Sequence, residues 1–322
     1  MSDQSPASGF VPPTGSGDIR HLLPPRSAFE AGQPIYGGFG HAGRGSRMLG
    51  HGRRAVAAST VSSVVVVAAL VSLFLFAPGS ANVRHTFFSP HALWQSFIGN
   101  PKQGYYSVGA ALWLNIRMFL VAEPLILLLS LFVALIRQSR GPIMFPFRGL
   151  ATVYVDIFRG VPLLLVVYLL GFGLPALRLT VISNQSATFY GVTALVLSYS
   201  AYVSEVFRAG LNSVHPSQAA AARSLGLTRG SAMRHVILPQ AVRTIIPPLL
   251  NDFISLQKDT ALVGVLGAIE TLQAANLYGS SVFNYSSFVM AAILFLLLTI
   301  PLARFTDHLI ARDRERRLAT IR

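Results

Sequence analysis

Long apolar runs with almost no charge constrain the fold of this chain more than any other feature. One of them, residues 55–77, reads AVAASTVSSVVVVAALVSLFLFA. A helix needs about 20 apolar residues to cross the roughly 30 Å hydrocarbon core of a bilayer. Over the whole sequence 52% of residues are hydrophobic and 12% are charged, whereas soluble domains carry about 25% charged residues. The pattern predicts an all-α membrane protein.

We expect about six transmembrane helices. They are predicted at 55–77, 107–136, 151–171, 188–210, 245–267 and 285–305. The connections between them alternate in charge: one set is rich in arginine and the other carries few basic residues. Basic loops are retained on the cytoplasmic side of a membrane. We therefore predict that the arginine-rich connections and both termini are cytoplasmic.

The ends and the first connection differ in composition from the spans. Residues 1–54 are rich in Gly, Pro, Ser and Arg, which predicts a disordered cytosolic tail. Residues 78–106 are predicted to form an external loop, and 311–322 a basic cytosolic tail. The net charge of +14 fits basic cytoplasmic loops better than nucleic-acid binding, since no basic patch is interleaved with aromatic residues on a soluble domain.

No catalytic constellation is visible. The chain has no cysteine, and its two lysines, Lys102 and Lys258, are followed by Gln103 and Asp259. A phosphate-binding P-loop needs Gly-Lys followed by Ser or Thr, so neither lysine can hold a nucleotide in that way. The histidines are scattered, which is typical of surface residues. We expect this chain to bind no metal or cofactor and to have no enzymatic activity of its own.

Polar residues inside predicted spans mark candidate sites on a solute path, because burying charge in a membrane is costly. Glu123 and Asn115 lie eight residues apart on the second span, about 80° around a helix, so they could share a face. Pro124 follows Glu123 and is expected to free a backbone carbonyl near Leu120. The alternative is structural: Glu123 pairs with an arginine of a neighbouring helix, with Arg117 a weaker candidate.

Two further charged pairs have i, i+3 spacing, which places both members on one helix face. Glu205 and Arg208 lie near the inner end of the fourth span, and Asp156 and Arg159 lie at the inner end of the third. An internal ion pair is one interpretation of each, and ligand binding is the other. The fifth span is unusually polar, which predicts that it faces a partner helix or a water-filled path. Its polar residues are Asn251, Asp252, Gln257, Lys258, Asp259 and Thr260.

The stretch SQAAAARSLGLTRGSAMRHVILPQA, residues 217–241, interrupts the apolar pattern with a polar, alanine-rich segment. We predict two short helices. Ser217 would cap the first, Gln218–Leu225, and Gly226 would end it in a left-handed conformation. Thr228 would cap the second, Arg229–Leu238, and Pro239 would mark its limit.

This stretch resembles the EAA loop of permease subunits of ATP-binding-cassette (ABC) importers. The family pattern is Glu-Ala-Ala, three residues, Gly, nine residues, an aliphatic residue, any residue, then Leu-Pro. The sequence departs from it at the first position, where alanine replaces glutamate. In the order of the motif, the matching residues are Ala220, Ala221, Ala222, Gly226, Val236, Ile237, Leu238 and Pro239.

The resemblance extends to DIFRGVPLLLVVYLLGFGLP (156–175), AYVSEVFRAGLNSV (201–214) and LPQAVRTIIPPLLNDFISLQKDTALVGVLG (238–267), which look like permeases of the polar amino acid uptake branch. It covers about 107–310. It implies a type I importer permease with a five-helix core, so that 55–77 is an additional N-terminal helix. It also implies a place in the bacterial cytoplasmic membrane.

The resemblance implies a set of partners as well. Two permease chains, identical or related, would form the passage, and two ATPase chains using ATP and magnesium would dock on the cytosolic loop 211–244. An external solute-binding protein would deliver the solute. The residues expected to form the ATPase contact are Gln218, Ala220, Ala221, Ala222, Arg223, Leu225, Gly226, Leu238 and Pro239.

Three alternatives stay open from the sequence. The first is an importer permease for another small solute, such as an opine, a sulfur compound or a phosphonate. The second is a secondary transporter driven by an ion gradient, which would keep the charges in the membrane but has no need of the 217–241 pattern. The third is a membrane-embedded enzyme, for which no catalytic constellation is found.

Overall fold

The computed structural model describes residues 53–321, so the predicted disordered tail at 1–54 lies almost wholly outside the described residues. The described chain is nearly all helical, which confirms the predicted fold class. A π-helical turn, Met233–Ile237, and two 3₁₀ segments, Pro101–Gln103 and Thr260–Leu266, connect some of the helices. The α-helices are α2 (Arg53–Phe76), α3 (Ser80–Phe87), α4 (Pro90–Ile98), α5 (Val108–Gln138), α6 (Phe145–Gly160), α7 (Leu163–Ala176), α8 (Ala187–Asn212), α9 (Pro216–Ser224), α10 (Arg229–Ala232), α11 (Leu238–Asp259), α12 (Thr271–Val282) and α13 (Ser286–Ile321).

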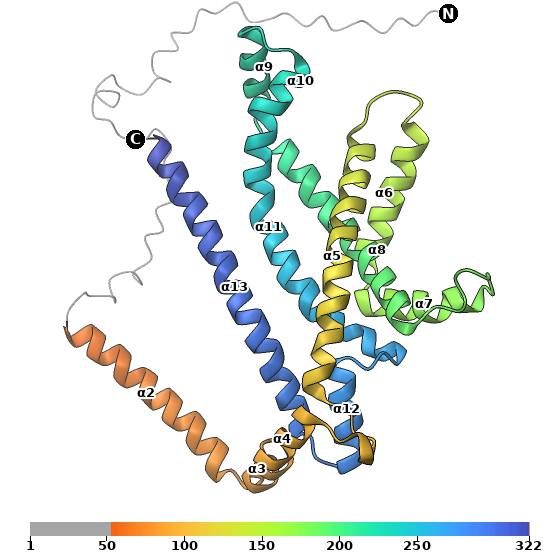
Figure 1. Ribbon diagram of the computed structural model, residues 1–322. Coiled ribbons are helices and arrows are strands. Elements are labelled where there is room, and N and C mark those ends of the chain that lie inside the picture. The colour runs from red at the N-terminus through yellow and green to blue at the C-terminus, as the bar shows by residue number, and fades with distance from the viewer. Residues whose placement is uncertain (1–52, 322) are drawn as a thin grey trace, which may run out of the picture. The chain divides into compact units, whose positions relative to one another are not determined.

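The chain divides into two compact units, residues 1–71 and 72–322. At the centre of the second unit lies α8, which packs on α5, α6, α7 and α11 (Figure 1). Glycines bring the helices close together: a Cβ atom at Gly191 would collide with Val263, and one at Gly210 would collide with Ile245. Small residues at such contacts are typical of helix packing in membranes. The main buried cluster includes Met118, Ile126, Leu195, Leu256 and Val263.

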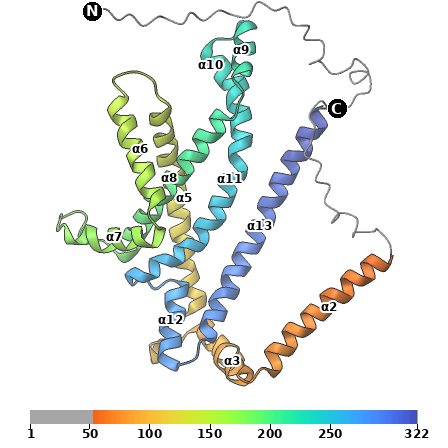
Figure 2. The ribbon, with the colours of Figure 1, turned by 180° about the vertical axis from the view of Figure 1, so that it is seen from behind.

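The two ends of this unit carry different elements. The α5–α6 turn and α9–α10 lie at one end, whereas α4 and α12 lie at the other (Figures 1 and 2). Residues 78–106, expected as a loop, are largely helical. Ser89 caps α4, and its backbone N–H donates to the Ser286 hydroxyl over 3.1 Å. The Tyr278 hydroxyl donates to Gln95 over 3.2 Å, so α4 is attached to both α12 and α13.

By length and composition, three described helices could each cross a membrane, within α2, α5 and α13. The number rises to five if two bent pairs each form one span: α6 with α7, and the helical stretch 229–266 with α12. Helix α8 coincides with the predicted fourth span and has 26 residues, which is long enough to cross. It is not among the three helices that could each cross a membrane by themselves, because its serines and tyrosines lower its mean hydropathy.

The predicted third span, 151–171, is wrong as a single helix. Helix α6 ends at Gly160, α7 begins at Leu163, and the chain bends by 110° between them. Pro162 explains the break, because a proline disfavours helical geometry in the preceding residue, and Val161 is extended. At the C-terminus, α13 continues as a helix through most of the predicted tail at 311–322.

Candidate functional site

The polar stretch at 217–241 begins with α9, whose start differs from the prediction. The cap is His215, whose ring nitrogen Nδ1 accepts from the Ser217 backbone N–H over 3.2 Å, and Pro216 opens the helix. The predicted cap at Ser217 is therefore wrong by two residues. The stop at Gly226 is as predicted: its φ is +84°, and the Leu227 N–H donates to the Ala222 carbonyl over 3.1 Å.

One side of α9 is packed and the other is open. Ala222 is buried against the protein, whereas the Leu225 side chain is 84% exposed at the tip of the helix. Gln218 and Ala221 precede Leu225 by seven and four positions, so they lie on the same open side. An exposed apolar residue beside small alanines forms a surface that can contact another protein closely. Ala220 and Arg223 are exposed as well.

The second predicted helix of this stretch does not end at Pro239. Thr228 caps α10 as expected, its hydroxyl accepting from the Ser231 N–H over 3.2 Å. The π turn Met233–Ile237 follows, and α11 starts at Leu238 with Pro239 in its first turn. A π turn holds one extra residue per turn, so the missing N–H and the ring of Pro239 fit without breaking the helix. The predicted boundary at Pro239 is therefore wrong.

Asn115, predicted for the solute path, lies in a buried hydrogen-bond network. Its amide nitrogen donates to the Thr260 hydroxyl and to Glu270 Oε2, both over 3.1 Å, and its oxygen accepts from the Thr271 N–H over 3.0 Å. Its exposed fraction is 1%. Asn115 therefore joins α5 to the junction between α11 and α12. Glu270 also caps α12 by accepting from the N–H groups of Leu272 and Gln273.

A polar cavity of about 250 Å³ lies where α7, α8 and α11 meet. The Tyr199 hydroxyl donates to Asp259 over 2.6 Å at its wall. The Ser198 hydroxyl is buried and has no hydrogen-bond partner among the described residues. Asp252 and Asp259 line the cavity about two helical turns apart on α11. The full lining is Leu163, Ser198, Tyr199, Tyr202, Asp252, Ser255 and Asp259.

Glu123 lies near this cavity and away from the Asn115 network. Its side chain is half-buried and close enough to Asp252 and Tyr199 to interact with them electrostatically. It forms no salt bridge with Arg117 or with any other residue whose side chain the structure describes. The arrangement gathers acidic groups on α5 and α11 with no basic partner, so it favours a positively charged group between them. Ser198, Tyr199 and Tyr202 carry no charge, so nothing in the sequence marked them as site residues.

Glu205 and Arg208 form the expected i, i+3 ion pair, with Arg208 Nη2 and Glu205 Oε2 2.6 Å apart. Arg137 of α5 also pairs with Glu205, so one carboxylate joins α5 to the end of α8. The ion pair expected between Asp156 and Arg159 is wrong. The Arg159 guanidinium instead lies 5.7 Å from the centre of the Tyr202 ring, because cation–π contact with α8 competes with pairing along α6.

The other polar residues of α11 point in different directions. Asn251 and Lys258 are exposed on this chain, whereas Gln257 is buried and accepts a hydrogen bond from the Thr299 hydroxyl of α13 over 2.8 Å. Lys258 therefore does not pair with Asp259, the next residue. An exposed charge on a membrane helix needs a partner chain or water beside it.

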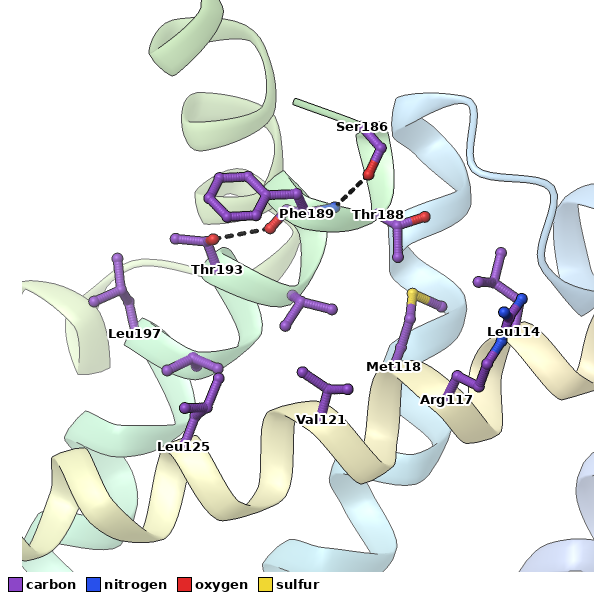
Figure 3. A pocket seen from close by; sticks show the side chains of 12 residues that line it. Leu114, Arg117, Met118, Val121, Leu125, Ser186, Thr188, Phe189, Thr193 and Leu197 are labelled. Atoms are coloured by element: carbon purple, nitrogen blue, oxygen red, sulfur yellow. Dashed lines mark hydrogen bonds between the residues drawn. The ribbon is translucent and has the colours of Figure 1, made fainter. Parts of the chain in front are cut away.

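A further cavity, about 630 Å³, contains none of the predicted path residues. It lies between α5 and the first half of α8, and Figure 3 shows its mostly apolar lining. Leu125 and Leu197 lie at one end, and Arg117 with Thr188 toward the other. Arg117 is the one charged residue of the lining. In the part of the chain that the structure describes, no cluster of three or more His, Cys, Asp or Glu residues could hold a metal ion.

Residues 126–315 match the family model described as "Binding-protein-dependent transport system inner membrane component". The match covers more than half of the chain. The protein belongs to this family of ABC importer permeases. The residues matched include α6 to α12 and therefore both α9 and the polar cavity.

Individual relatives of this permease agree with the family. It is 39% identical over 165 residues to the Bacillus subtilis protein named "Probable glutamine ABC transporter permease protein GlnM", covering 51% of this chain and 74% of that one. It is 35% identical over 202 residues to the glutamate transport system permease protein GluC of Corynebacterium glutamicum, covering 60% and 87%. A solved structure titled "Crystal structure of an amino acid ABC transporter with histidines" shares 33% identity at a TM-score of 0.59, covering 64% and 93%.

The permease is thus the membrane-spanning transport component of an ABC importer, as its EAA-like loop indicated. Proteins of this family work together with an ATPase and a solute-binding component. The membrane spans and the all-helical fold agree with that role.

Proposed function

We propose that this permease imports polar amino acids, with a preference for those that carry a positive charge. The observation that carries the proposal is the acidic cavity between α7, α8 and α11. Asp252 and Asp259 line it, Glu123 is near, and no basic side chain of the described chain pairs with them. Grouped carboxylates in a membrane favour a bound cation, because each would otherwise face a like charge without compensation.

The cavity also offers groups for the rest of an amino acid. The first residue of α7, Leu163, lines it, and the free N–H groups of a helix N-terminus bind carboxylates well. The unpartnered Ser198 hydroxyl provides one more polar contact. An α-carboxylate at the start of α7 and ammonium groups at Asp252 and Asp259 would match both charges of the solute.

The coupling surface is the second part of the proposal. Two ATPase chains would each contact an α9 through the open side that carries Gln218, Ala221 and Leu225, beside the packed Ala222. ATP and magnesium would bind in those chains, and this chain would hydrolyse nothing. A second permease chain, identical or related, would face the exposed residues Asn251 and Lys258 of α11.

The orientation follows from charge. The α9 end carries arginines at 137, 140, 148, 208, 223, 229 and 234, so we place it in the cytoplasm with both chain termini. The opposite end, with α3, α4 and α12, would face the external solute-binding protein. We propose that the membrane is the bacterial cytoplasmic membrane, because the matched relatives are bacterial amino acid permeases.

The proposal can be tested with the complete transporter in proteoliposomes. Uptake of labelled arginine, glutamine and glutamate is measured for the wild type and for Asp259→Asn, with Asp156→Asn as a control that removes an exposed carboxylate elsewhere. We expect Asp259→Asn to lower arginine uptake at least tenfold and the control to leave it unchanged. Equal loss in both variants, or a wild-type preference for glutamate, would contradict the cationic preference.

A second measurement tests the importer itself. The purified permease alone is expected to hydrolyse no ATP and to drive no uptake, and both activities should require the ATPase chain. Robust uptake by the lone chain without ATP would instead indicate a secondary transporter.

A further inference from the structure

A strongly basic pocket of about 360 Å³ lies at the α9 end of the permease, apart from the acidic cavity. It is formed by the end of α5, the α5–α6 turn, the start of α6 and the end of α8. Four of its seven lining residues are arginines. The lining is Arg137, Gln138, Ser139, Arg140, Arg148, Arg208 and Asn212.

Internal contacts hold most of these arginines in place. Glu205 pairs with both Arg137 and Arg208, and among the described side chains it is the one carboxylate that does so. Arg148 donates to the backbone carbonyls of Ser139 over 2.9 Å and Gly141 over 3.4 Å. Arg140 is exposed and forms no hydrogen bond or salt bridge with any described residue. A single carboxylate therefore balances four guanidinium groups, which leaves a site for an anion.

Exposed apolar side chains flank this pocket. Ile143 is 82% exposed, Phe145 70% and Phe147 53%. All three lie between Arg140 and Arg148 in the sequence. The Arg148 guanidinium lies 6.0 Å from the centre of the Phe145 ring. Basic and apolar groups thus meet at the end of membrane helices, where headgroups of a bilayer meet its acyl chains.

We propose that this pocket binds the phosphate of an anionic phospholipid. The arginines would hold the headgroup, and its acyl chains would cover Ile143, Phe145 and Phe147. A free phosphate would satisfy the arginines but would leave these apolar side chains uncovered, so the surroundings favour the lipid over the ion.

The pocket also has a connection to the coupling surface. A second pocket of about 370 Å³ shares Gln138 and Arg140 with it. The remaining lining of that second pocket includes His215, Pro216 and Ala219 at the start of α9. A lipid held by Arg140 would therefore lie next to the base of α9, and its presence would affect how firmly α9 is positioned for the ATPase.

The binding step can be measured without transport. The full-length permease is placed in nanodiscs of phosphatidylcholine mixed with phosphatidylglycerol, and retained lipids are identified by native mass spectrometry. We expect phosphatidylglycerol to be retained selectively, and the double variant Arg140→Gln, Arg148→Gln to lose roughly tenfold or more of it, since each basic residue contributes to anionic-lipid attraction. Arg312→Gln, an exposed arginine outside the pocket, is the matched control and should retain the lipid.

Three results would overturn the proposal. One is equal retention of phosphatidylglycerol by the wild type and the double variant at unchanged melting temperature. Another is displacement of the lipid by millimolar inorganic phosphate, which would identify a simple phosphate site. The third is a double variant that retains the lipid but no longer copurifies with the ATPase. That result would show that the arginines contact the ATPase and do not bind the lipid. If folding is affected, the single variant Arg140→Gln replaces the double one, because Arg140 has no internal partner.

Discussion

Asn115 shows how one amide can join three helical segments. It bonds to Thr260, Glu270 and the Thr271 backbone, all within a region closed to water. Its side chain uses both N–H donors and accepts one hydrogen bond, and it is buried, so a solute cannot reach it in this structure. The residue that seemed suited to the path from its position on α5 is instead part of the scaffold.

Replacing this residue should destabilise the protein strongly. Asn115→Leu would remove one of the three hydrogen bonds that the Glu270 carboxylate accepts and would leave the Thr271 N–H without a partner in a buried site. Unsatisfied buried groups cost about 1–3 kcal/mol each, so we expect a loss of roughly 2–4 kcal/mol and a lower melting temperature. Asn212→Leu is the control, because the Asn212 side chain is exposed and bonds only to Gln138. Equal melting temperatures for the two variants would contradict the scaffold role.

A second prediction at this scale concerns the missing glutamate of the EAA-like motif. Ala220 is exposed, so Ala220→Glu introduces the family residue without a steric conflict and should leave transport unchanged or higher. Ala221→Glu, one position along, places a charge on the side that also carries Leu225. We expect it to abolish ATP-driven uptake while membrane insertion stays normal. Uptake assays and membrane fractionation check both, and equal effects of the two variants would argue against this docking side.

At the scale of elements, the π turn decides how α9 and α10 are attached to α11. It sits directly before Pro239 and makes the stretch 229–266 one continuous helical unit. If α9 contacts the ATPase as we propose, its motion can therefore pass into α11, which lines the acidic cavity through Asp252 and Asp259. A separate two-helix connector that ended at Pro239 would transmit such motion less directly.

Removing the extra residue of the π turn tests this connection. Deletion of His235 should convert the turn to α-helix and rotate α9 and α10 by about 100° relative to α11. We expect the deletion to uncouple ATP hydrolysis from uptake while the protein still folds. His235→Ala keeps the residue count and should transport normally. Coupled transport in the deletion variant would show that the register of this turn is unimportant.

At the scale of the whole molecule, the segment before α5 contributes to the packed unit. Within that unit, α4 is bonded to α12 and α13 through Gln95 and the Ser89 backbone, and Ala92 and Ser96 are buried. The segment is therefore part of the fold, although its sequence looked like an external loop.

Truncation tests how much α4 contributes to the stability of the packed unit. A chain that starts at Gly79 retains α3 and α4, and we expect it to give a monodisperse peak in detergent by size-exclusion chromatography. A chain that starts at Val108 lacks α4 and would expose the faces of α5 and α13 that α4 covers, so it should aggregate or melt at a lower temperature. Similar behaviour of the two truncated chains would mean that α4 contributes little.

Local features were predictable because they depend on residues close together in the chain. The apolar runs located the helices, and the Gly226 stop and the Thr228 cap follow from neighbouring residues. The errors at Ser217 and Pro239 are also local. A histidine took the role of the cap, and a π turn, which has no clear signature in one sequence, accommodated the proline.

The sequence by itself therefore determined the all-helical membrane class, the position of the EAA-like stretch and the family, since hydropathy and motif spacing are properties of the linear chain. Only the tertiary structure decided which polar residues meet. Tyr199 and Asp259 are 60 positions apart, and Asn115 and Glu270 are 155 apart. Such pairs form because α8 packs between its neighbours and the α11–α12 junction returns to α5. The packed glycines and the break at Pro162 set how the helices are rotated. That rotation decides whether a polar residue lines a cavity or is buried in the scaffold.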